Sequence, residues 1–422
     1  MPTCSIIAIG NEIIRGKIID SNSAFISTKL FDLGFSQTQI SAVGDTLAAI
    51  KSELLSRANT SDILITTGGL GPTSDDLTRQ AIAETASVGL ELNQQALDKL
   101  TEFCTRRNRE VNENNRRQVF FPTGATIFPN AVGTADGFVT PLKLSSGKIV
   151  PIFSLPGIPK EMKYLVENFV LPWIKDSFKT LTAPVTETLR CFGLPESQIG
   201  EIIENCNLDS KVDVSYRPMF PEILLQFFVS GNEANASSIA KEAAAKVRNT
   251  IGPEFIVSDS ESKTVLQSVT ELLKAKNLTL SVAESCSGGL LADAIVSQPG
   301  ASEIFYGSVV CYSNQAKTNY LNVPASLIDT CGAVSSEVAA AMAKRCREIS
   351  KTDLALAITG VAGPDGGSAE KPVGTIWVAL DSEAVAVTTK LNLPWDREYN
   401  RRYSVTKALD LVRRQLLGLP LS

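Results

Sequence analysis

The chain has 422 residues, of which 44% are hydrophobic and 20% are charged, and it contains eight cysteines and no histidine. This length predicts two or three domains, and the composition is that of a folding chain. The formal net charge of -5 argues against a protein that coats nucleic acid.

The absence of histidine narrows the possible chemistry further. It excludes Ser-His-Asp hydrolysis, cysteine catalysis that depends on histidine, and metal sites built on histidine. A bound metal ion would need mainly oxygen ligands, which favours magnesium or manganese. The cysteines form no CxxC pair, the N-terminus has no secretory signal, and no apolar run reaches the length of a membrane span. We therefore expect a soluble cytoplasmic protein with reduced thiols and no membrane contact.

The first part of the chain alternates predicted strands and helices. The predicted strands are 4–10, 39–45, 62–69 and 149–157, and the predicted helices are 21–35, 46–58, 93–108 and 160–174, with one more helix from about Thr73. Residues 121–138 form a loop-rich segment before the last of these strands. This order predicts an α/β domain with a mostly parallel sheet, which binds ligands at the carboxyl ends of its strands.

The segment TTGGLGPTSDDLT, residues 66–78, is the most specific pattern of the first half. Gly68 and Gly69 let an anion approach the backbone amides, because glycine has no side chain. Asp75 and Asp76 are predicted in the first turn of a helix, where acids also balance the helix dipole. Two acids beside a glycine-rich anion loop favour a metal–phosphate site over capping. The GxxxxGK[ST] pattern of a P-loop is absent.

Other polar residues are expected at the same edge of the sheet. Glu12 follows the first strand, and Asp20 and Asn22 lie at the next helix start. Glu161 follows a later strand, although it would equally suit a solvated helix.

These segments resemble the molybdopterin-binding (MoaB/MogA-like) fold over residues 1–175, and also the N-terminal half of the competence/damage-inducible protein CinA family. The resemblance implies a three-layer domain with metal-dependent ADP-ribose pyrophosphatase activity. It implies a phosphate site and a site for Mg, Mn or Co; the phosphate-site residues are Glu12, Asn22, Gly68, Gly69 and Thr73, and the metal ligands are Asp75, Asp76 and Glu161. Asp136 stands where the family has a proline, and its added carboxylate is expected to alter metal use or substrate affinity.

Residues 176–258 change in character. A strand, a helix and a second strand are predicted, followed by a strong helix former at 236–251. This small α+β module carries no evident chemistry, and it resembles the KH-like middle domain of the same family. The polar run 258–263 is predicted to be a linker.

The last part of the chain, residues 259–422, alternates again. The predicted helices are 265–277, 288–298, 314–323, 335–350 and 397–417, and the predicted strands are 278–285, 307–312, 353–360 and 375–380. Between the last two strands lies the glycine-rich AGPDGG. This order predicts a second α/β domain.

The corner AESCSGG places Ser285 between a buried strand and a helix start. A nucleophile there would gain from free amides and the helix dipole, which stabilise an oxyanion. Gly288 and Gly289 would let a substrate approach the backbone. A serine N-cap with a tight turn fits this heptapeptide equally well.

The segment YSNQAK supplies a base that the missing histidine cannot. If its strand lies beside the one ending at Ser285, the amine of Lys317 and the phenol of Tyr312 can both reach the serine hydroxyl. A lysine in a desolvated pocket has a lowered pKa and can accept a proton. Taken singly, each of these residues would also suit a surface position.

Two further features suit a phosphate. The run AITGVAGPDGG is a plausible backbone cradle, with Thr359, Gly360 and Gly363 in it. Arg397 and Arg401 lie four residues apart on one helix face, although a solvated basic face is a serious competitor.

These motifs together closely resemble the C-terminal CinA domain, from Lys263 to Leu417. The resemblance implies metal-free deamidation of nicotinamide mononucleotide, with Ser285 as nucleophile, Lys317 as base and Tyr312 as partner in proton transfer. The substrate-binding residues that we expect are Ser287, Gly288, Gly289, Thr359, Gly360, Gly363, Arg397 and Arg401. Ser287 replaces a threonine of the family motif and is a minor rival nucleophile. Cys286 is another, but alternation along the strand predicts that it points into the core.

The expected ligands are small pyridine nucleotides, the expected assembly is a homodimer, and no direct nucleic-acid partner is expected. The alternative is a non-catalytic protein that binds a nucleotide or pterin and acts as a partner in competence or recombination.

Overall fold

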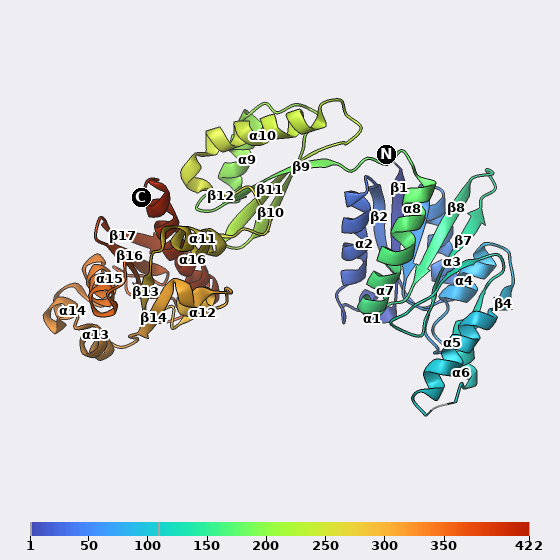
Figure 1. The fold of residues 1–422 in the computed structure, drawn as a ribbon, viewed down its shortest axis with the longest axis horizontal. Coiled ribbons are helices and arrows are strands. Elements are labelled where there is room, and N and C mark those ends of the chain that lie inside the picture. Colours follow the sequence, from blue (N-terminus) through green and yellow to red (C-terminus); the bar gives the residue numbers. More distant parts are fainter. Residues whose placement is uncertain (1, 109, 422) are drawn as a thin grey trace. The chain divides into compact units, whose positions relative to one another are not determined.

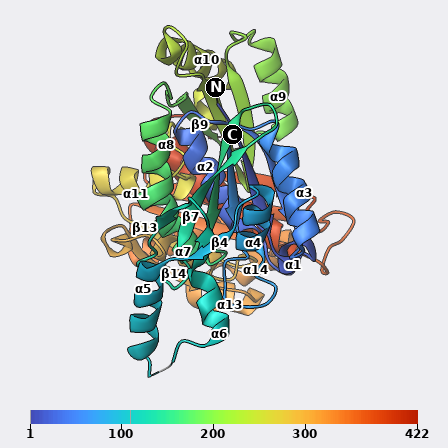
Figure 2. The same cartoon turned by 90° about the vertical axis from the view of Figure 1, so that its right-hand side faces the viewer.

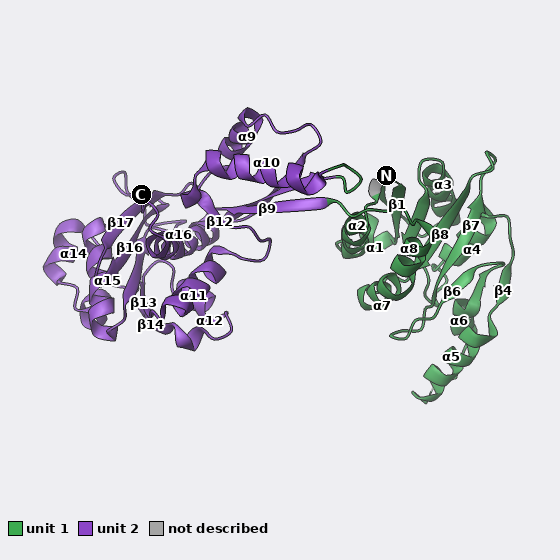
Figure 3. Ribbon diagram, turned by 45° about the horizontal axis from the view of Figure 1, so that its top comes forward, with its two compact units in different colours: residues 1–184, 230–234 green, residues 185–229, 235–422 purple. Residues whose placement is uncertain are grey.

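The computed structural model describes residues 2–108 and 110–421, which divide into two compact units (Figure 3). The first comprises the residues up to Pro184 together with Ser230–Ala234. The second comprises Val185–Val229 together with the residues from Asn235 on. Each of the three predicted segments contains a sheet of its own, while the boundaries at 175 and 258 stay predictions.

The first unit is built on a six-stranded sheet in the order β2-β1-β3-β8-β7-β6. Four neighbouring strands are parallel and the last two are antiparallel, as the mostly parallel prediction requires. The strands are β1 (Thr3–Ile9), β2 (Ser36–Val43), β3 (Ile63–Thr67), β6 (Thr126–Phe128), β7 (Gly137–Lys143) and β8 (Ile149–Leu155), with a separate pair β4 (Leu90–Leu92) and β5 (Phe120–Pro122).

Helices cover both faces of this sheet, so that the unit has three layers (Figures 1 and 2). Apolar side chains of α2, α7 and α8 pack on one face, and those of α3, α4 and α5 pack on the other. The helices are α1 (Asn11–Ile14), α2 (Ser21–Asp32), α3 (Leu47–Ala58), α4 (Thr78–Thr85), α5 (Gln94–Thr105), α6 (Glu113–Arg116), α7 (Pro159–Leu165) and α8 (Leu171–Ser177), with a 3-10 turn at Arg117–Val119 and a π-helical stretch at Val166–Val170.

The second unit contains two sheets. An antiparallel sheet in the order β10-β11-β9-β12 carries two helices, and a five-stranded sheet follows in the order β14-β13-β15-β16-β17. The elements of the first sheet are β9 (Val185–Cys191), α9 (Glu196–Asn205), β10 (Asp213–Met219), β11 (Glu222–Val229), α10 (Ala236–Ile251), a 3-10 turn (Pro253–Phe255) and β12 (Ile256–Ser258).

In the five-stranded sheet β13, β14 and β15 run parallel, and β16 and β17 run antiparallel. The strands are β13 (Leu280–Glu284), β14 (Phe305–Val310), β15 (Leu354–Gly360), β16 (Thr375–Ser382) and β17 (Ala386–Asn392). The helices are α11 (Val265–Lys276), α12 (Leu290–Val296), α13 (Asn314–Leu321), α14 (Ala325–Cys331), α15 (Ser336–Ser350) and α16 (Arg397–Leu417), with a 3-10 turn at Ala301–Glu303.

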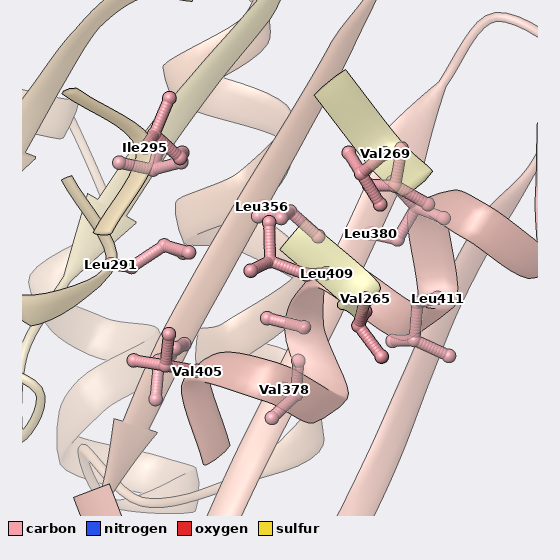
Figure 4. Close-up of a cluster of buried hydrophobic side chains, with 14 of the residues drawn as sticks. Val265, Val269, Leu291, Ile295, Leu356, Val378, Leu380, Val405, Leu409 and Leu411 are labelled. Atoms are coloured by element: carbon pink, nitrogen blue, oxygen red, sulfur yellow. The ribbon is translucent and has the colours of Figure 1, made fainter. Parts of the chain in front are cut away.

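Two cores cover the faces of this sheet. In one, side chains of α11, α12 and α16 pack on the strands; Figure 4 shows Val265, Leu291 and Val405 beside Leu356. In the other, α13, α14 and α15 cover the opposite face with residues such as Met342. The predicted α/β class is therefore confirmed. Among the described residues, no helix is both long enough and apolar enough to cross a membrane.

Several elements differ from the sequence-based expectations. The helix predicted from about Thr73 begins only at Thr78, so Asp75 and Asp76 lie in the preceding turn and not in a first helical turn. The elements β7, β10, α14 and β17 were not predicted, and the loop-rich segment contains the short strands β5 and β6.

Candidate active sites

Ser285 lies in a tight turn between β13 and α12. Gly288 and Gly289 have φ angles of 60° and 97°, in the left-handed region that glycine adopts without a Cβ penalty. The backbone N–H of Ser285 donates to the carbonyl of Ile358 on β15, with 2.9 Å between nitrogen and oxygen. The turn is thereby tied to the neighbouring strand.

Lys317 is the basic group that contacts the Ser285 hydroxyl in the described part of the chain. Its Nζ lies 2.9 Å from the Oγ of Ser285 and 3.0 Å from the carbonyl oxygen of Cys311. Because β14 pairs in parallel with β13, the start of α13 is brought to the end of β13, as the sequence pattern required. The lysine side chain is 1% exposed, and burial lowers its pKa from the ordinary value. A neutral amine in this position can accept the proton of the serine.

Tyr312 does not join this pair. Its side chain is 62% exposed, and its hydroxyl accepts a hydrogen bond from Nη2 of Arg397 at 3.2 Å. No hydrogen bond connects it to Ser285 or Lys317 in the described part of the chain. Successive side chains of extended backbone point to opposite sides, so that Cys311 enters the core while Tyr312 turns outward. The expected reach of the phenol to the serine is therefore not seen.

Of the two arginines that were predicted to share a face of α16, Arg401 contacts the Ser285 turn and Arg397 contacts the glycine-rich loop. Nη1 of Arg397 lies 2.8 Å from the carbonyl oxygen of Gly363, and Nη2 of Arg401 lies 2.6 Å from that of Ser287. The neighbouring Arg402 contacts the carbonyl of Phe220 instead. The guanidinium of Arg401 therefore borders the same turn as the serine, and that of Arg397 borders the loop at Gly363.

The predicted glycine-rich cradle is shaped mainly by packing. The hydroxyl of Thr359 donates to the carbonyl of Ala333, and a Cβ on Gly360 would lie 2.7 Å from the Cα of Ile376. Gly363 has a φ of 95°. Close contact with β16 accounts for the glycine at position 360. The carbonyl oxygen of Gly363 accepts a hydrogen bond from Arg397.

The two rival nucleophiles occupy different surroundings. Cys286 belongs to the apolar core as predicted, and burial raises the pKa of its thiol to about 12. Ser287 is 0% exposed, and its hydroxyl has no hydrogen-bond partner among the described residues. Of the three side chains in this corner, Ser285 is the one that Lys317 contacts.

Glu284, the residue before the serine, was not singled out from the sequence. Its buried carboxylate accepts hydrogen bonds from the N–H groups of Gly289, Leu291 and Ala292 at 2.9–3.0 Å. The expectation that amides at the start of α12 are free for an oxyanion is therefore wrong for these three. A sequence signal existed, since Glu284 is the one charged residue of the predicted strand 278–285, which precedes the Gly-Gly helix start.

The first unit contains a cavity of about 490 Å³ at the carboxyl ends of β1 and β3. It is bordered by all the polar residues and glycines predicted for the phosphate and metal sites, namely Glu12, Asn22, Gly68, Gly69, Thr73, Asp75, Asp76 and Glu161. The Oδ1 of Asn22 is buried and has no hydrogen-bond partner in the described residues. The prediction that these residues lie at one edge of the sheet agrees with their positions around this cavity.

The acids of the TTGGLGPTSDD loop organise the loop itself. The carboxylate of Asp76 accepts from the backbone N–H groups of Gly71 and Thr73, each at 2.8 Å. Asp75 accepts from the hydroxyl of Thr73. Bonds of this kind, from a carboxylate to nearby backbone amides, stabilise a turn in place of a helix. They explain why α4 begins later than predicted.

Asp45 is a further acid of this cavity that the sequence reasoning missed. Burial raises the pKa of its carboxyl, and the nearby carboxylates of Glu12, Asp75 and Asp76 raise it as well. The signal was its place directly after the second strand, in QISAVGD. A divalent cation would be stabilised by this negative potential, and the oxygen donors suit a hard ion.

The predicted metal ligands are nevertheless not assembled around one point. Among the described residues, no three acidic or cysteine side chains are close enough to hold an ion. Glu161 accepts from Nδ2 of Asn130, and burial raises the pKa of its carboxyl. Asp136 does not border the cavity; it pairs with Lys99 and accepts from the N–H of Asn130.

Two family models match separate parts of the chain. A family model described as "CinA C-terminal domain" matches residues 262–416, and one described as "Probable molybdopterin binding domain" matches residues 5–176. A "CinA-like protein" of Citrifermentans bemidjiense is 39% identical over 98% of this chain and 97% of that protein. A "CinA-like protein" of Geobacter metallireducens is 37% identical over 98% of this chain and 99% of its own length. A "Putative competence-damage inducible protein" of Clostridium acetobutylicum is 35% identical over 98% of this chain and 99% of its own length.

Proposed function

The chain belongs to the CinA family, and on that premise we propose that its second unit hydrolyses the amide of nicotinamide mononucleotide to nicotinic acid mononucleotide and ammonia. The observation that carries the proposal is the 2.9 Å contact between Nζ of Lys317 and Oγ of Ser285. The substrate class comes from the family resemblance, and the chemistry comes from the residues in the corner.

In the first half of the reaction the neutral amine of Lys317 takes the hydroxyl proton of Ser285. The serine oxygen then attacks the amide carbon, and the carbonyl oxygen becomes an oxyanion. The backbone N–H groups of Cys286 and Ser287 donate to no other residue in the described structure and are the donors that we assign to it. Collapse breaks the C–N bond, and Lys317 returns the proton to the leaving nitrogen, which departs as ammonia.

Water completes the reaction. Lys317 accepts a proton from the water that attacks the ester of Ser285, and returns it to the serine oxygen as the C–O bond breaks. The products are the carboxylic acid and the free hydroxyl. We assign Arg397 and Arg401 to binding of the nucleotide's phosphate, in keeping with their positive charge and their places at the Gly363 loop and at the Ser285 turn. Tyr312, bound to Arg397, is assigned to the substrate side and not to the proton transfer.

We propose a second activity for the first unit, the metal-dependent cleavage of ADP-ribose at its pyrophosphate. The cavity bordered by Glu12, Asp45, Asp75 and Asp76 supports it. Magnesium is often bound by only one or two carboxylates, with substrate phosphates completing its coordination, so a preassembled cluster of three acids is not required. These carboxylates would hold a Mg, Mn or Co ion, which would neutralise charge on the phosphates.

An ammonia-release assay with nicotinamide mononucleotide, with and without a chelator, tests the main proposal. Release that the chelator does not affect supports a serine amidase that needs no metal. Binding of nucleotides without any release of ammonia or cleavage of ADP-ribose would support the alternative, a non-catalytic nucleotide- or pterin-binding partner in competence or recombination.

A further inference from the structure

Glu284 occupies the start of α12, next to the proposed nucleophile. Its side chain is 0% exposed. Its carboxylate accepts from the N–H groups of Gly289 at 3.0 Å, Leu291 at 3.0 Å and Ala292 at 2.9 Å. The hydroxyl of Ser308 on β14 donates to the same carboxylate at 3.3 Å. With four donors, both carboxylate oxygens are held in one place.

Helix capping alone does not explain a carboxylate in this position. A buried charge is costly unless hydrogen bonds compensate it, and the four donors to Glu284 take that part here, since no ion pair of this residue is found in the described part of the chain. The helix that it caps, α12, has only seven residues and is already held by Leu291 and Ile295 in the core (Figure 4). An exposed serine or aspartate would cap such a helix at a smaller desolvation cost.

The turn that carries Ser285 is held at three points, one of which is Glu284. On its β13 side the N–H of Ser285 is bound to Ile358, and at its middle the carbonyl of Ser287 is bound by Arg401. Glu284 joins the end of β13 to the far side of the turn, because its backbone belongs to the strand and its carboxylate binds Gly289. The backbone path between these points decides where the serine oxygen lies.

We infer that Glu284 is a positioning residue for the proposed amidase. Its carboxylate holds the amides of Gly289, Leu291 and Ala292, keeps the Oγ of Ser285 against the Nζ of Lys317, and leaves the amides of Cys286 and Ser287 to the oxyanion. The inference rests on the proposed function, because Glu284 acts on the reaction only through Ser285.

The test compares wild type with Glu284→Gln, which keeps the size of the side chain but turns an NH₂ group toward backbone donors. Two rates are measured: turnover of nicotinamide mononucleotide, and labelling of Ser285 by phenylmethylsulfonyl fluoride, located by peptide mass spectrometry. A misplacement of about 1 Å near a reaction centre can lower a rate about 10²-fold. We expect kcat to fall about 10–100-fold with KM little changed, and labelling to slow by a similar factor.

Glu222→Gln is the matched control. Glu222 is also a buried carboxylate at a helix start, and it accepts from the N–H of Val265, the first residue of α11. This variant should lose thermal stability while its kcat and its labelling rate stay at the wild-type values. A role for Glu284 in stability alone would give the same pattern in Glu284→Gln, and that result would overturn the inference.

If Glu284→Gln does not fold, Ser308→Ala replaces it, because it removes one donor to the carboxylate and leaves the three amide bonds. We then expect labelling to slow about two- to fivefold, as loss of one hydrogen bond of about 0.5–1 kcal/mol implies. Wild-type labelling in Ser308→Ala would contradict the positioning role. Failure of the wild-type chain to be labelled at Ser285 would overturn the nucleophile, and with it both the proposed amidase and this inference.

Discussion

Lys317 is buried without an acidic partner among the described residues. A charged ammonium in such a position loses its hydration, and the two hydrogen bonds to Ser285 and Cys311 are its only replacement among the described residues, which is why burial lowers the pKa of Lys317. The same property that destabilises the charged form prepares the amine to accept a proton. The proposed base therefore lowers the stability of the chain at neutral pH while it serves the reaction.

Replacing this lysine separates the two effects. We expect Lys317→Met to lower kcat about 10²–10⁴-fold, the range of general base catalysis, and to leave the melting temperature unchanged or higher at pH 7. The pKa of Lys317 is lower in the folded chain than in the unfolded one, so the unfolded chain binds more protons between the two pKa values. The stability of wild type should accordingly rise relative to Lys317→Met as pH increases through that window.

Thermal unfolding of both proteins at a series of alkaline pH values measures this difference. A gap in stability that stays constant with pH, or an activity of Lys317→Met equal to that of wild type, would contradict the assignment of a neutral buried amine.

Sequence reasoning identified Ser285 and Lys317 but not the roles of their neighbours. The pair followed from two adjacent parallel strands whose ends meet at one edge of a sheet. The outward direction of Tyr312 depends on which of two successive residues the core takes in, and the bonds of Glu284 depend on which amides its carboxylate reaches. Such details are decided by packing and are not carried by residue spacing.

At the scale of elements, the five-stranded sheet of the second unit depends on close approach of β15 and β16 at Gly360. The register pairs Gly360 with Ile376, and a Cβ on the glycine would come within 2.7 Å of the Cα of Ile376. The glycine therefore serves the sheet, although its place at a strand end also suggested an anion cradle.

Gly360→Ala should destabilise the second unit by about 1–3 kcal/mol, because the added methyl group has no space beside β16. Gly200→Ala, in the middle of α9, is the contrasting change: nothing lies within 4 Å of its Cβ, and alanine should stabilise the helix by about 0.5–1 kcal/mol. Urea unfolding of the two variants checks the signs. Equal stability of Gly360→Ala and wild type would show that β16 moves away without cost.

Most helices were predictable because their apolar spacing and caps agree, as in α11, where Thr264 and Gln267 form a capping box. The missed strands β10 and β17 lie at sheet edges and bury few side chains, so they lack the continuous apolar run of a central strand. The late start of α4 depended on the turn that Asp76 stabilises. In that segment the bonds from Asp76 to nearby backbone amides outweighed the helix propensity of the residues.

At the scale of the whole molecule, the two candidate sites lie in different compact units, each with its own sheet and core. The acidic cavity belongs to the first unit, and the Ser285 corner belongs to the second. Each site should therefore work without the other.

Asp76→Ala tests this independence. The change removes a carboxylate from the cavity and releases the amides of Gly71 and Thr73. We expect metal-dependent cleavage of ADP-ribose to fall at least about 10²-fold, while deamidation of nicotinamide mononucleotide stays within about twofold of wild type. Both activities are measured on the same preparation, with and without a chelator. Equal loss of the two would argue against separate sites.

The central claim is that Ser285 is the nucleophile of an amidase, and Ser285→Ala tests it most directly. Ammonia release from nicotinamide mononucleotide is measured for the full-length variant and for wild type, with circular dichroism as the control for folding. Release by wild type and none above background by the folded variant is the expected result. Undiminished release by Ser285→Ala would contradict the account.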